Sequence, residues 1–235
     1  MGNCQKKEDQ IGEHEIDTRH KEEDSFNKHF QTEKKNLLIK NDEMKKYVSL
    51  NSQSVVSLPE DVIYSGKLHD SRANGVGTLR SETFVFRGDF VNGKPNGKGT
   101  LTYTNGEEYN GDLVNGFFHG NGCFKSNQGF TYNGEFKMNK FDGQGKCVWV
   151  NGNEYEGEFK GNVFHGLGKY RYVDGKEYGG MYKGGLKHGE GMIIIPDKNF
   201  EFKGGWEDGK LVRISSVKLN EKSLPVELFD MNDLN

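Results

Sequence analysis

The sequence is poor in the residues from which most compact domains are built. Only 32% of its 235 residues are hydrophobic, and its mean hydropathy is strongly negative. This composition argues against a large conventional core. No run approaches the roughly 18 apolar residues of a membrane-spanning helix, so we expect any membrane attachment to be peripheral.

The sequence has few cysteines and no large excess of positive or negative charge. Cys4, Cys123 and Cys147 match no disulfide or zinc spacing and follow no signal peptide, so we expect a cytosolic chain. Lys plus Arg number 32 and Asp plus Glu 35, and the two signs are interspersed along the chain. A nucleic-acid partner needs a concentrated basic surface, so we expect none.

Glycine, in contrast, is abundant. Of the 33 glycines, all but Gly2 and Gly12 fall between Gly66 and Gly209, so this segment must carry the fold. Aromatic-x-Gly starts recur in it at 23-residue intervals from Phe86 to Tyr178, which is typical of a repeat array. We expect six complete units and a partial seventh that fades after Leu211. The unit starts are Tyr64, Phe86, Tyr109, Tyr132, Tyr155, Tyr178 and Phe202.

Each unit contains the pattern of two strands. An aromatic, a glycine and a second apolar residue alternate with period two, and a Gly-x-Gly pair with a further apolar residue follows. Asn92-Gly93 and Asn105-Gly106 are typical of the turns between them. We therefore expect an all-β fold, an elongated single-layer antiparallel meander of hairpins. Its repeat glycines are Gly88, Gly97, Gly99, Gly111, Gly120, Gly122, Gly134, Gly143, Gly145, Gly157, Gly166 and Gly168.

The aromatic face of this sheet is the predicted binding surface. Glycine normally weakens a strand, so its regular recurrence needs an explanation. We expect that it leaves room for a large ring from the neighbouring strand to lie flat. A single-layer sheet cannot bury this face by itself, and an exposed apolar strip usually marks a partner site. A helix or a second copy of the array, as in a homodimer, would cover it. The predicted face comprises Phe90, Tyr103, Phe136, Trp149, Phe159, Tyr172, Tyr182 and Trp206.

The repeated Tyr-x-Gly-x-Phe and His-Gly-x-Gly patterns, the latter in 119–122, 165–168 and 188–191, resemble the MORN repeat family over residues 64–211. The resemblance implies a scaffold at a membrane or a cytoskeletal structure. It also leaves open a ciliary or cortical component without a lipid, and a phosphoinositide-binding module. MORN arrays also precede kinase and methyltransferase domains, but only 24 residues follow residue 211, so we expect no enzyme.

No group of residues in the array predicts chemistry. His119, His165 and His188 share a repeat column, but strand spacing separates successive units by about 10 Å, too far to share one metal ion. The Gly-x-Gly pairs lack the helix and the Lys-Ser or Lys-Thr of a phosphate-binding loop. We therefore expect no metal, no cofactor and no catalytic residue.

The N-terminal sequence resembles a dual acylation signal. Gly2 could carry myristate and Cys4 palmitate, although Lys6 stands where Ser or Thr is usual. Two acyl chains anchor stably where one is marginal, and nearby lysines attract anionic lipid. We interpret residues 1–20 as a targeting segment, 21–63 as a charged linker, disordered or loosely helical, and 212–235 as a capping or docking tail. The expected location is the cytoplasmic face of a membrane, with the cytoskeleton or a cilium as the alternative.

Overall fold

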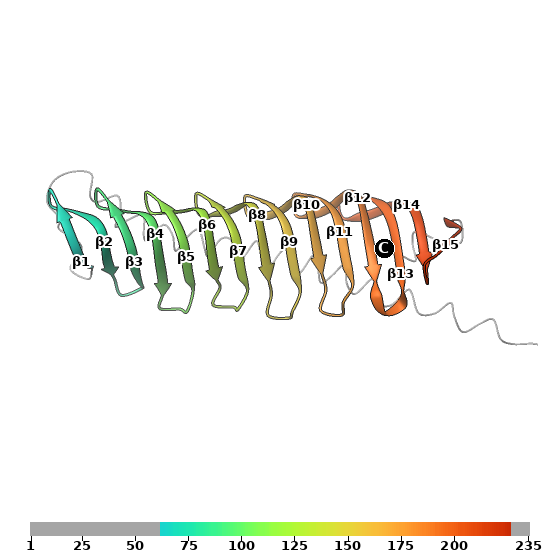
Figure 1. Cartoon of the computed structure of the whole chain (residues 1–235), viewed down its shortest axis with the longest axis horizontal. Coiled ribbons are helices and arrows are strands. Elements are labelled where there is room, and N and C mark those ends of the chain that lie inside the picture. Colours follow the sequence, from blue (N-terminus) through green and yellow to red (C-terminus); the bar gives the residue numbers. More distant parts are fainter. Residues whose placement is uncertain (1–61, 227–235) are drawn as a thin grey trace, which may run out of the picture. The chain divides into compact units, whose positions relative to one another are not determined.

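The computed structural model describes residues 62–226. These residues form fifteen strands of one antiparallel sheet, hydrogen-bonded in the order in which they follow along the chain (Figure 1). The predicted all-β meander of hairpins is confirmed. The chain divides into two compact units, whose described parts are residues 62–163 and 164–226, and each is described by itself. No helix within residues 62–226 has the length and apolar character needed to cross a membrane.

The first unit contains nine strands. They are β1 (Ile63–His69), β2 (Arg72–Arg80), β3 (Phe84–Val91), β4 (Lys94–Tyr103), β5 (Glu108–Val114), β6 (Phe117–Lys125), β7 (Thr131–Lys137), β8 (Lys140–Val148) and β9 (Glu154–Lys160). Each repeat contributes one hairpin, so that β5 and β6, for example, come from the repeat that starts at Tyr109.

The second unit continues the pattern with six strands and one short 3-10 turn. They are β10 (Val163–Arg171), β11 (Glu177–Lys183), β12 (Leu186–Ile195), η2 (Pro196–Lys198), β13 (Phe200–Glu207), β14 (Lys210–Leu219) and β15 (Lys222–Leu224). The seventh repeat, predicted to fade after Leu211, is therefore a full hairpin of β13 and β14, and a short further strand follows it.

The turns inside the repeats, which we call the tips, differ from the loops between repeats. At the tip between β3 and β4, Asn92 and Gly93 both have positive φ, at 51° and 84°, as the Asn-Gly sequence predicts. In the loop between β4 and β5 only Gly106 does, at 91°. There the Asn105 side chain accepts a hydrogen bond from the Glu107 N–H at 3.2 Å instead. The prediction is confirmed at the tip and wrong for Asn105, which acts through its side chain.

A row of glycines crosses each unit and carries the repeat rings. In the Tyr109 repeat a Cβ added to Gly111 would lie 2.5 Å from the Tyr109 Oη, and one added to Gly122 would lie 2.7 Å from its Cε2. The predicted glycine floor is confirmed, but the ring covers the glycine of its own strand as well as that of the neighbouring strand. The row comprises Gly66, Gly77, Gly88, Gly99, Gly111, Gly122, Gly134, Gly145 and Gly157 in the first unit, and Gly168, Gly180, Gly191 and Gly204 in the second.

The remaining repeat glycines bend the hairpins. Gly97, Gly120, Gly143 and Gly166 have φ values of 108°, 57°, 115° and 53°, a conformation that other residues rarely adopt. In the Tyr109 repeat the pairing shifts register beside Gly120, between Gly111 and Asp112, and such bulges bend a strand. The hairpins accordingly curve over at their tips (Figure 1).

Candidate functional site

The predicted binding face is not exposed. Seven of its eight aromatic residues are at most 9% exposed, and Trp149 is half-buried. The expectation that a single-layer sheet leaves this face uncovered is wrong, because each bent hairpin folds its tip back over its own floor. The seven buried residues are Phe90, Tyr103, Phe136, Phe159, Tyr172, Tyr182 and Trp206.

The repeat tyrosines show how this self-covering works. The Tyr109 ring lies on the glycine row and stacks under Phe118 from the tip, with centroids 3.6 Å apart and planes 9° apart. Phe136 of the next repeat meets it edge-on at 5.2 Å. The Tyr109 hydroxyl donates to the Asp112 carbonyl oxygen at 2.7 Å, and burial raises its pKa well above the ordinary value. A ring held from every side cannot contact a partner while its hairpin is folded.

Tyr132 repeats the arrangement one unit later. It stacks under Phe141 at 3.7 Å, meets Phe159 edge-on at 5.0 Å and donates to the Glu135 carbonyl oxygen at 2.8 Å. Burial raises its pKa as well. The regularity of these contacts shows that the aromatic column is the core of the sheet.

Adjacent tips are joined by hydrogen bonds. The Asn139 N–H donates to the Phe118 carbonyl oxygen at 3.1 Å, and its Oδ1 accepts from the Phe118 N–H at 2.6 Å. Asn162 repeats both bonds with Phe141. Gly116 occupies the same turn position, and there the facing residue is Pro95, which has no N–H to satisfy. Asparagine therefore stands where the facing residue has an N–H to satisfy, and glycine stands where it has none.

The opposite face, which we call the outer face, carries the side chains that alternate with the glycine row. One column of this face holds the middle residue of each Gly-x-Gly and the residue paired with it. In the first unit its members are polar or charged apart from Val76: Val76 and Asp89, Lys98 and Asp112, Asn121 and Glu135, and Gln144 and Glu158. Lys98 lies 2.6 Å from Asp112, and this hydrogen bond lowers the pKa of that carboxyl. In the second unit the same columns hold Leu167 opposite Met181, which are 65% and 45% exposed. This column is therefore apolar at Leu167 and Met181, and the next pair in it is Glu190 opposite Gly205.

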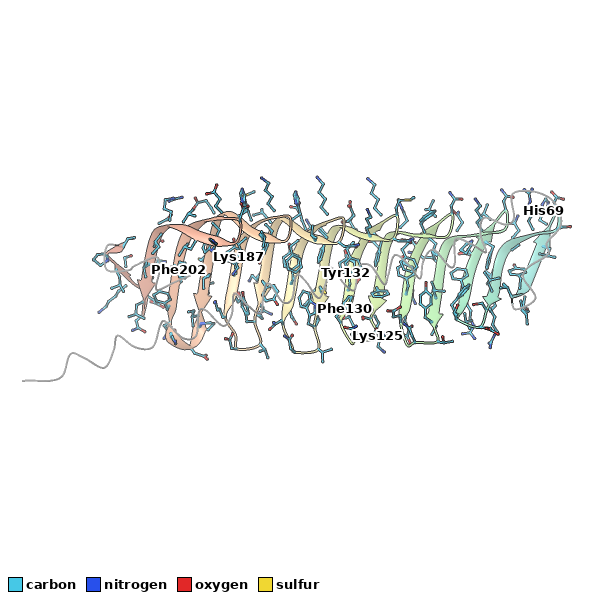
Figure 2. The ribbon with its side chains drawn as sticks, turned by 180° about the vertical axis from the view of Figure 1, so that it is seen from behind. His69, Lys125, Phe130, Tyr132, Lys187 and Phe202 are labelled. Carbon is cyan, nitrogen blue, oxygen red and sulfur yellow. The ribbon has the colours of Figure 1, made fainter. Side chains whose placement is uncertain are left out.

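The tips of the first unit are basic. Within residues 69–72, 91–94, 114–117, 137–140 and 160–163 the only carboxylate is Asp70. Figure 2 shows His69 at the tip edge of the sheet and Lys125 at the opposite, loop edge. Lys137, Lys140 and Lys160 are exposed, and no carboxylate of residues 62–226 forms a salt bridge with them. The basic tip residues are Arg72, Lys94, Lys137, Lys140 and Lys160.

Sequence reasoning missed two buried charged side chains, Glu107, which is 2% exposed, and Lys187. Lys187 stands in the column that holds Phe118 and Phe141 in earlier repeats, and it is 7% exposed. Its ammonium group lies 5.0 Å from the Tyr178 ring centroid and 3.5 Å from the Tyr172 Oη. A cation over an aromatic face replaces the stacked phenyl ring of the other repeats. The signal available in the sequence was a lysine in an otherwise apolar column.

The other predicted sites have simpler outcomes. Within residues 62–226 no three His, Cys, Asp or Glu side chains gather as metal ligands would. The Nδ1 atoms of His119 and His188 are buried, without a hydrogen-bond partner in the described part of the chain. Gly2 and Cys4 lie outside the described residues.

The match to a repeat family agrees with this geometry. The MORN repeat family matches residues 86–108, 109–131, 132–154, 155–177 and 178–200. No curated protein sequence matches the chain. A solved structure of the SAS-4 (dCPAP) TCP domain of Drosophila melanogaster, in complex with a proline-rich motif of Ana2 (dSTIL), is similar with 9% identity and a TM-score of 0.36. The match covers 72% of this chain and 98% of that one.

The matched segments coincide with the hairpins of the sheet. Each begins at the aromatic residue whose ring covers the glycine row and ends before the next such residue. MORN repeats are a non-catalytic module that generally mediates protein or membrane interactions. Residues 86–200 are therefore five consecutive MORN repeats, and the chain contains a repeat scaffold.

Proposed function

We propose that the chain is a non-enzymatic scaffold held at a cytoplasmic membrane leaflet by acyl groups on Gly2 and Cys4. In this proposal the basic tips of the first unit face anionic lipid, and the outer face contacts a protein partner. The carrying observation is the segregation of charge in the first unit, where five basic residues and one acidic residue share the tips.

The charge gathered at the tips favours contact with lipid, whereas the overall charge of the chain does not. Balanced overall charge gives little reason to expect membrane contact. However, each Lys or Arg near an anionic leaflet contributes about 1 kcal/mol, and Lys137, Lys140 and Lys160 are exposed at one edge. The tips of the second unit do not share this bias, because Lys183, Lys210 and Lys222 are accompanied by Glu207, Asp208 and Glu221.

The acyl anchor is tested by metabolic labelling with a clickable myristate. We expect label on the wild-type chain and none on Gly2→Ala, which moves to the soluble fraction. A Cys4→Ser variant keeps the myristate and binds membranes less stably, because one chain alone is marginal. If Gly2→Ala stays in a detergent-insoluble cytoskeletal pellet, the chain is a structural component that needs no lipid, and the anchor proposal fails.

The basic tips are tested by flotation of the unacylated chain with vesicles of phosphatidylcholine and phosphatidylserine. We expect flotation that is lost in Lys137→Glu/Lys140→Glu/Lys160→Glu. The matched control, Arg80→Glu/Lys125→Glu/Lys203→Glu, changes net charge equally away from the tips and keeps most of the binding. Equal losses in both variants would point to general charge attraction.

The protein partner belongs to the outer face in this proposal, because the aromatic face is occupied by its own tips. Leu167 and Met181 form an exposed apolar pair on that face. A photo-crosslinking residue at position 167 is expected to capture a partner in cells, whereas one at exposed Asn121, in the corresponding polar column, captures little. Equal capture at both positions would remove the assignment.

A further inference from the structure

The sixth repeat, residues 178–200, differs from the repeats before it on the outer face of the sheet. Gly179 follows its aromatic start, where the five earlier repeats carry a polar or charged residue. Met181 stands two positions further on, where the four repeats before it carry Asp or Glu. The corresponding residues are Ser65, Arg87, Asn110, Asn133 and Glu156 in the first column, and Asp89, Asp112, Glu135 and Glu158 in the second.

The second strand of this repeat differs in the same way. In β12, Met192 and Ile194 flank the buried Ile193 and so lie on the outer face. The five earlier repeats hold Thr, Cys or Lys in place of Met192. Met192 lies opposite Gly179 in the pairing of β11 with β12. We call the resulting patch the apolar strip, and it comprises Leu167, Gly179, Met181, Met192 and Ile194.

The methionine in this strip does not serve the stability of its own repeat. In earlier repeats the carboxylate in its place holds the bulge of the hairpin. Asp112 accepts a hydrogen bond from the Asn121 N–H at 3.1 Å, and Glu135 accepts one from the Gln144 N–H at 2.9 Å. The thioether of Met181 cannot replace a carboxylate as acceptor, and its side chain is 45% exposed. The exchange therefore needs a reason outside the repeat.

The strip is uneven in a way that suits a bulky side chain. A Cβ added to Gly179 would meet no atom within 4 Å, so the glycine leaves a gap between its larger neighbours. At the loop edge the strip leads into a cavity of about 430 Å³, whose lining includes Ile194, Pro196 and Phe200. This volume falls in the range of about 300–1,000 Å³ that is typical of binding pockets.

The borders of the strip are ion pairs closed within the chain. On one side Glu177 lies 3.1 Å from Lys169 and 2.7 Å from Arg171. On the other side Glu190 forms a salt bridge with Arg213. These charges neutralise one another, so the strip is complementary to an uncharged, apolar surface of a partner.

A helix fits this surface better than an extended segment. β11 is hydrogen-bonded to β10 and β12, and β12 to β11 and β13, so the face offers an extended segment no backbone partners. A helix satisfies its own backbone. Strands lie about 4.8 Å apart, so β10 and β12 are separated by about 10 Å. Helical residues i and i+7 are separated by about the same distance.

A second copy of the chain fits the strip less well. Each partner of a stable dimer buries about 800 Å². Four aliphatic side chains, even if fully exposed, would supply roughly 250–500 Å². A larger contact between two copies would have to bury the bordering ion pairs, which is costly. The limited area therefore favours a single short segment.

We propose that the apolar strip docks an amphipathic helix of a protein partner. Apolar side chains at helix positions i, i+4 and i+7 lie over β10, β11 and β12, and the middle one fills the gap at Gly179. This inference rests on the proposed function in one respect, that the outer face is the side of the protein partner, and it adds the kind of partner.

Panning of a phage-displayed library tests the proposal, with random peptides of about 16 residues, or about four helical turns. The full chain is the target. Selected peptides are expected to carry apolar residues at i, i+4 and i+7. As synthetic peptides they should become helical on binding, and bind Gly179→Asn/Met181→Glu at least about tenfold more weakly by fluorescence anisotropy. This variant introduces the residue types of Asn133 and Glu135, so it should fold like wild type.

The matched control is Asn133→Ser/Glu135→Asp, in the same columns of the fourth repeat, which should bind the peptides like wild type. Four outcomes would overturn the proposal. Peptides that bind Gly179→Asn/Met181→Glu as tightly as wild type would place the site elsewhere. Selected sequences without a helical period would exclude a helix. Self-association of wild type that this variant abolishes would identify a second copy. Peptide binding that strengthens when residues 227–235 are deleted would identify the chain's own tail.

Failure here is distinguishable from failure of the proposed function. Capture of a partner at position 167 in cells, without selection of helical peptides, would keep the outer face as the partner's side and reject the helix. Helical peptides that require Gly179 and Met181, without preferential capture at position 167, would support the docking site and reject the proposed role of the outer face in cells.

Discussion

At the residue scale, the fold depends on the contact between one ring and two glycines. Tyr109 covers Gly111 and Gly122, and a methyl group on either would enter the ring. The ring in turn fills the space that glycine leaves, so the entropic cost of glycine in a strand is offset by burial of a large aromatic side chain. Neither residue type is explained without the other.

Gly122→Ala is therefore expected to lower the free energy of unfolding by about 1–3 kcal/mol, because the added methyl group forces the Tyr109 ring out of place. Gly179→Ala is the control. A Cβ at Gly179 meets no atom within 4 Å, and we expect a change within about 0.5 kcal/mol. Urea unfolding followed by circular dichroism measures both. Similar losses in the two variants would show that the glycine row is not required for ring packing.

The buried phenols make stability sensitive to alkali. Burial raises the pKa of Tyr109 and Tyr132 above the ordinary 10.0, so both stay protonated in the folded chain when the unfolded chain ionises. Their contribution is complete below pH 10 and declines as the pH rises towards the folded pKa. The expected slope is about 1.4 kcal/mol per pH unit for each phenol.

Urea midpoints measured from about pH 8 to pH 11 check this sign, and phenolate absorbance reports the ionisation itself. Tyr132→Phe removes one phenol and is expected to show a shallower alkaline decline, together with a lower stability at neutral pH from the lost bond to the Glu135 carbonyl. A decline equal to that of wild type would mean that Tyr132 ionises normally in the folded chain.

At the scale of the element, each hairpin has a flat part and a bent part. The glycine row lies in the flat part, and the positive-φ glycines such as Gly120 bend the hairpin beyond it. The bent tips then bond to one another, as Asn139 does to Phe118. A hairpin alone would bury little, but its tip covers its own ring and meets the next tip.

Asn139→Gly separates the side-chain bond from the turn conformation. Glycine adopts the φ of 64° found at Asn139 but leaves the buried Phe118 N–H without an acceptor. We expect a loss of about 1–3 kcal/mol in urea unfolding. Asn92→Gly, at an exposed turn position, serves as the reference and should change stability by less than about 0.5 kcal/mol. An equal effect of the two substitutions would assign the loss to the backbone.

At the scale of the whole molecule, the repeat is the unit of assembly. Within the first unit the ring contacts and tip bonds of the described residues join a hairpin to itself or to the next one, as Tyr109 joins Phe118 and Phe136. Repeat proteins of this kind have stabilities that are close to sums of repeat and neighbour contributions. We therefore expect the strand register to be kept when a whole repeat is removed.

Deletion of residues 109–131 is expected to leave a folded sheet with a wild-type β spectrum and a lower unfolding midpoint, since one core layer is lost. Deletion of 109–119 removes only part of one repeat, so that side chains instead of glycines would lie opposite the glycine row. This deletion is expected to unfold the array around it. Circular dichroism and limited proteolysis distinguish the two. A chain that tolerates both deletions equally would contradict a fixed register.

The strands, the glycine floor and the repeat register could be predicted from the sequence alone, because these depend on contacts between residues two positions apart or on adjacent strands. The alternation in Tyr109-x-Gly111 is sufficient to place the ring on its floor. The exposure of the aromatic face could not be obtained in this way. It depends on how far the bulge at Gly120 bends the hairpin, which decides whether Phe118 covers Tyr109 or points into solvent.

The distribution of charge was also decided by the tertiary structure. The sequence shows nearly equal totals of basic and acidic residues. The tertiary structure gathers Lys137, Lys140 and Lys160 at the tips, because the repeat brings the same turn to one edge each time. The candidate surfaces therefore moved from the rings to the tips and the outer face. Local periodicity sets which residues pair, and the bend of the paired strands sets which of them meet solvent.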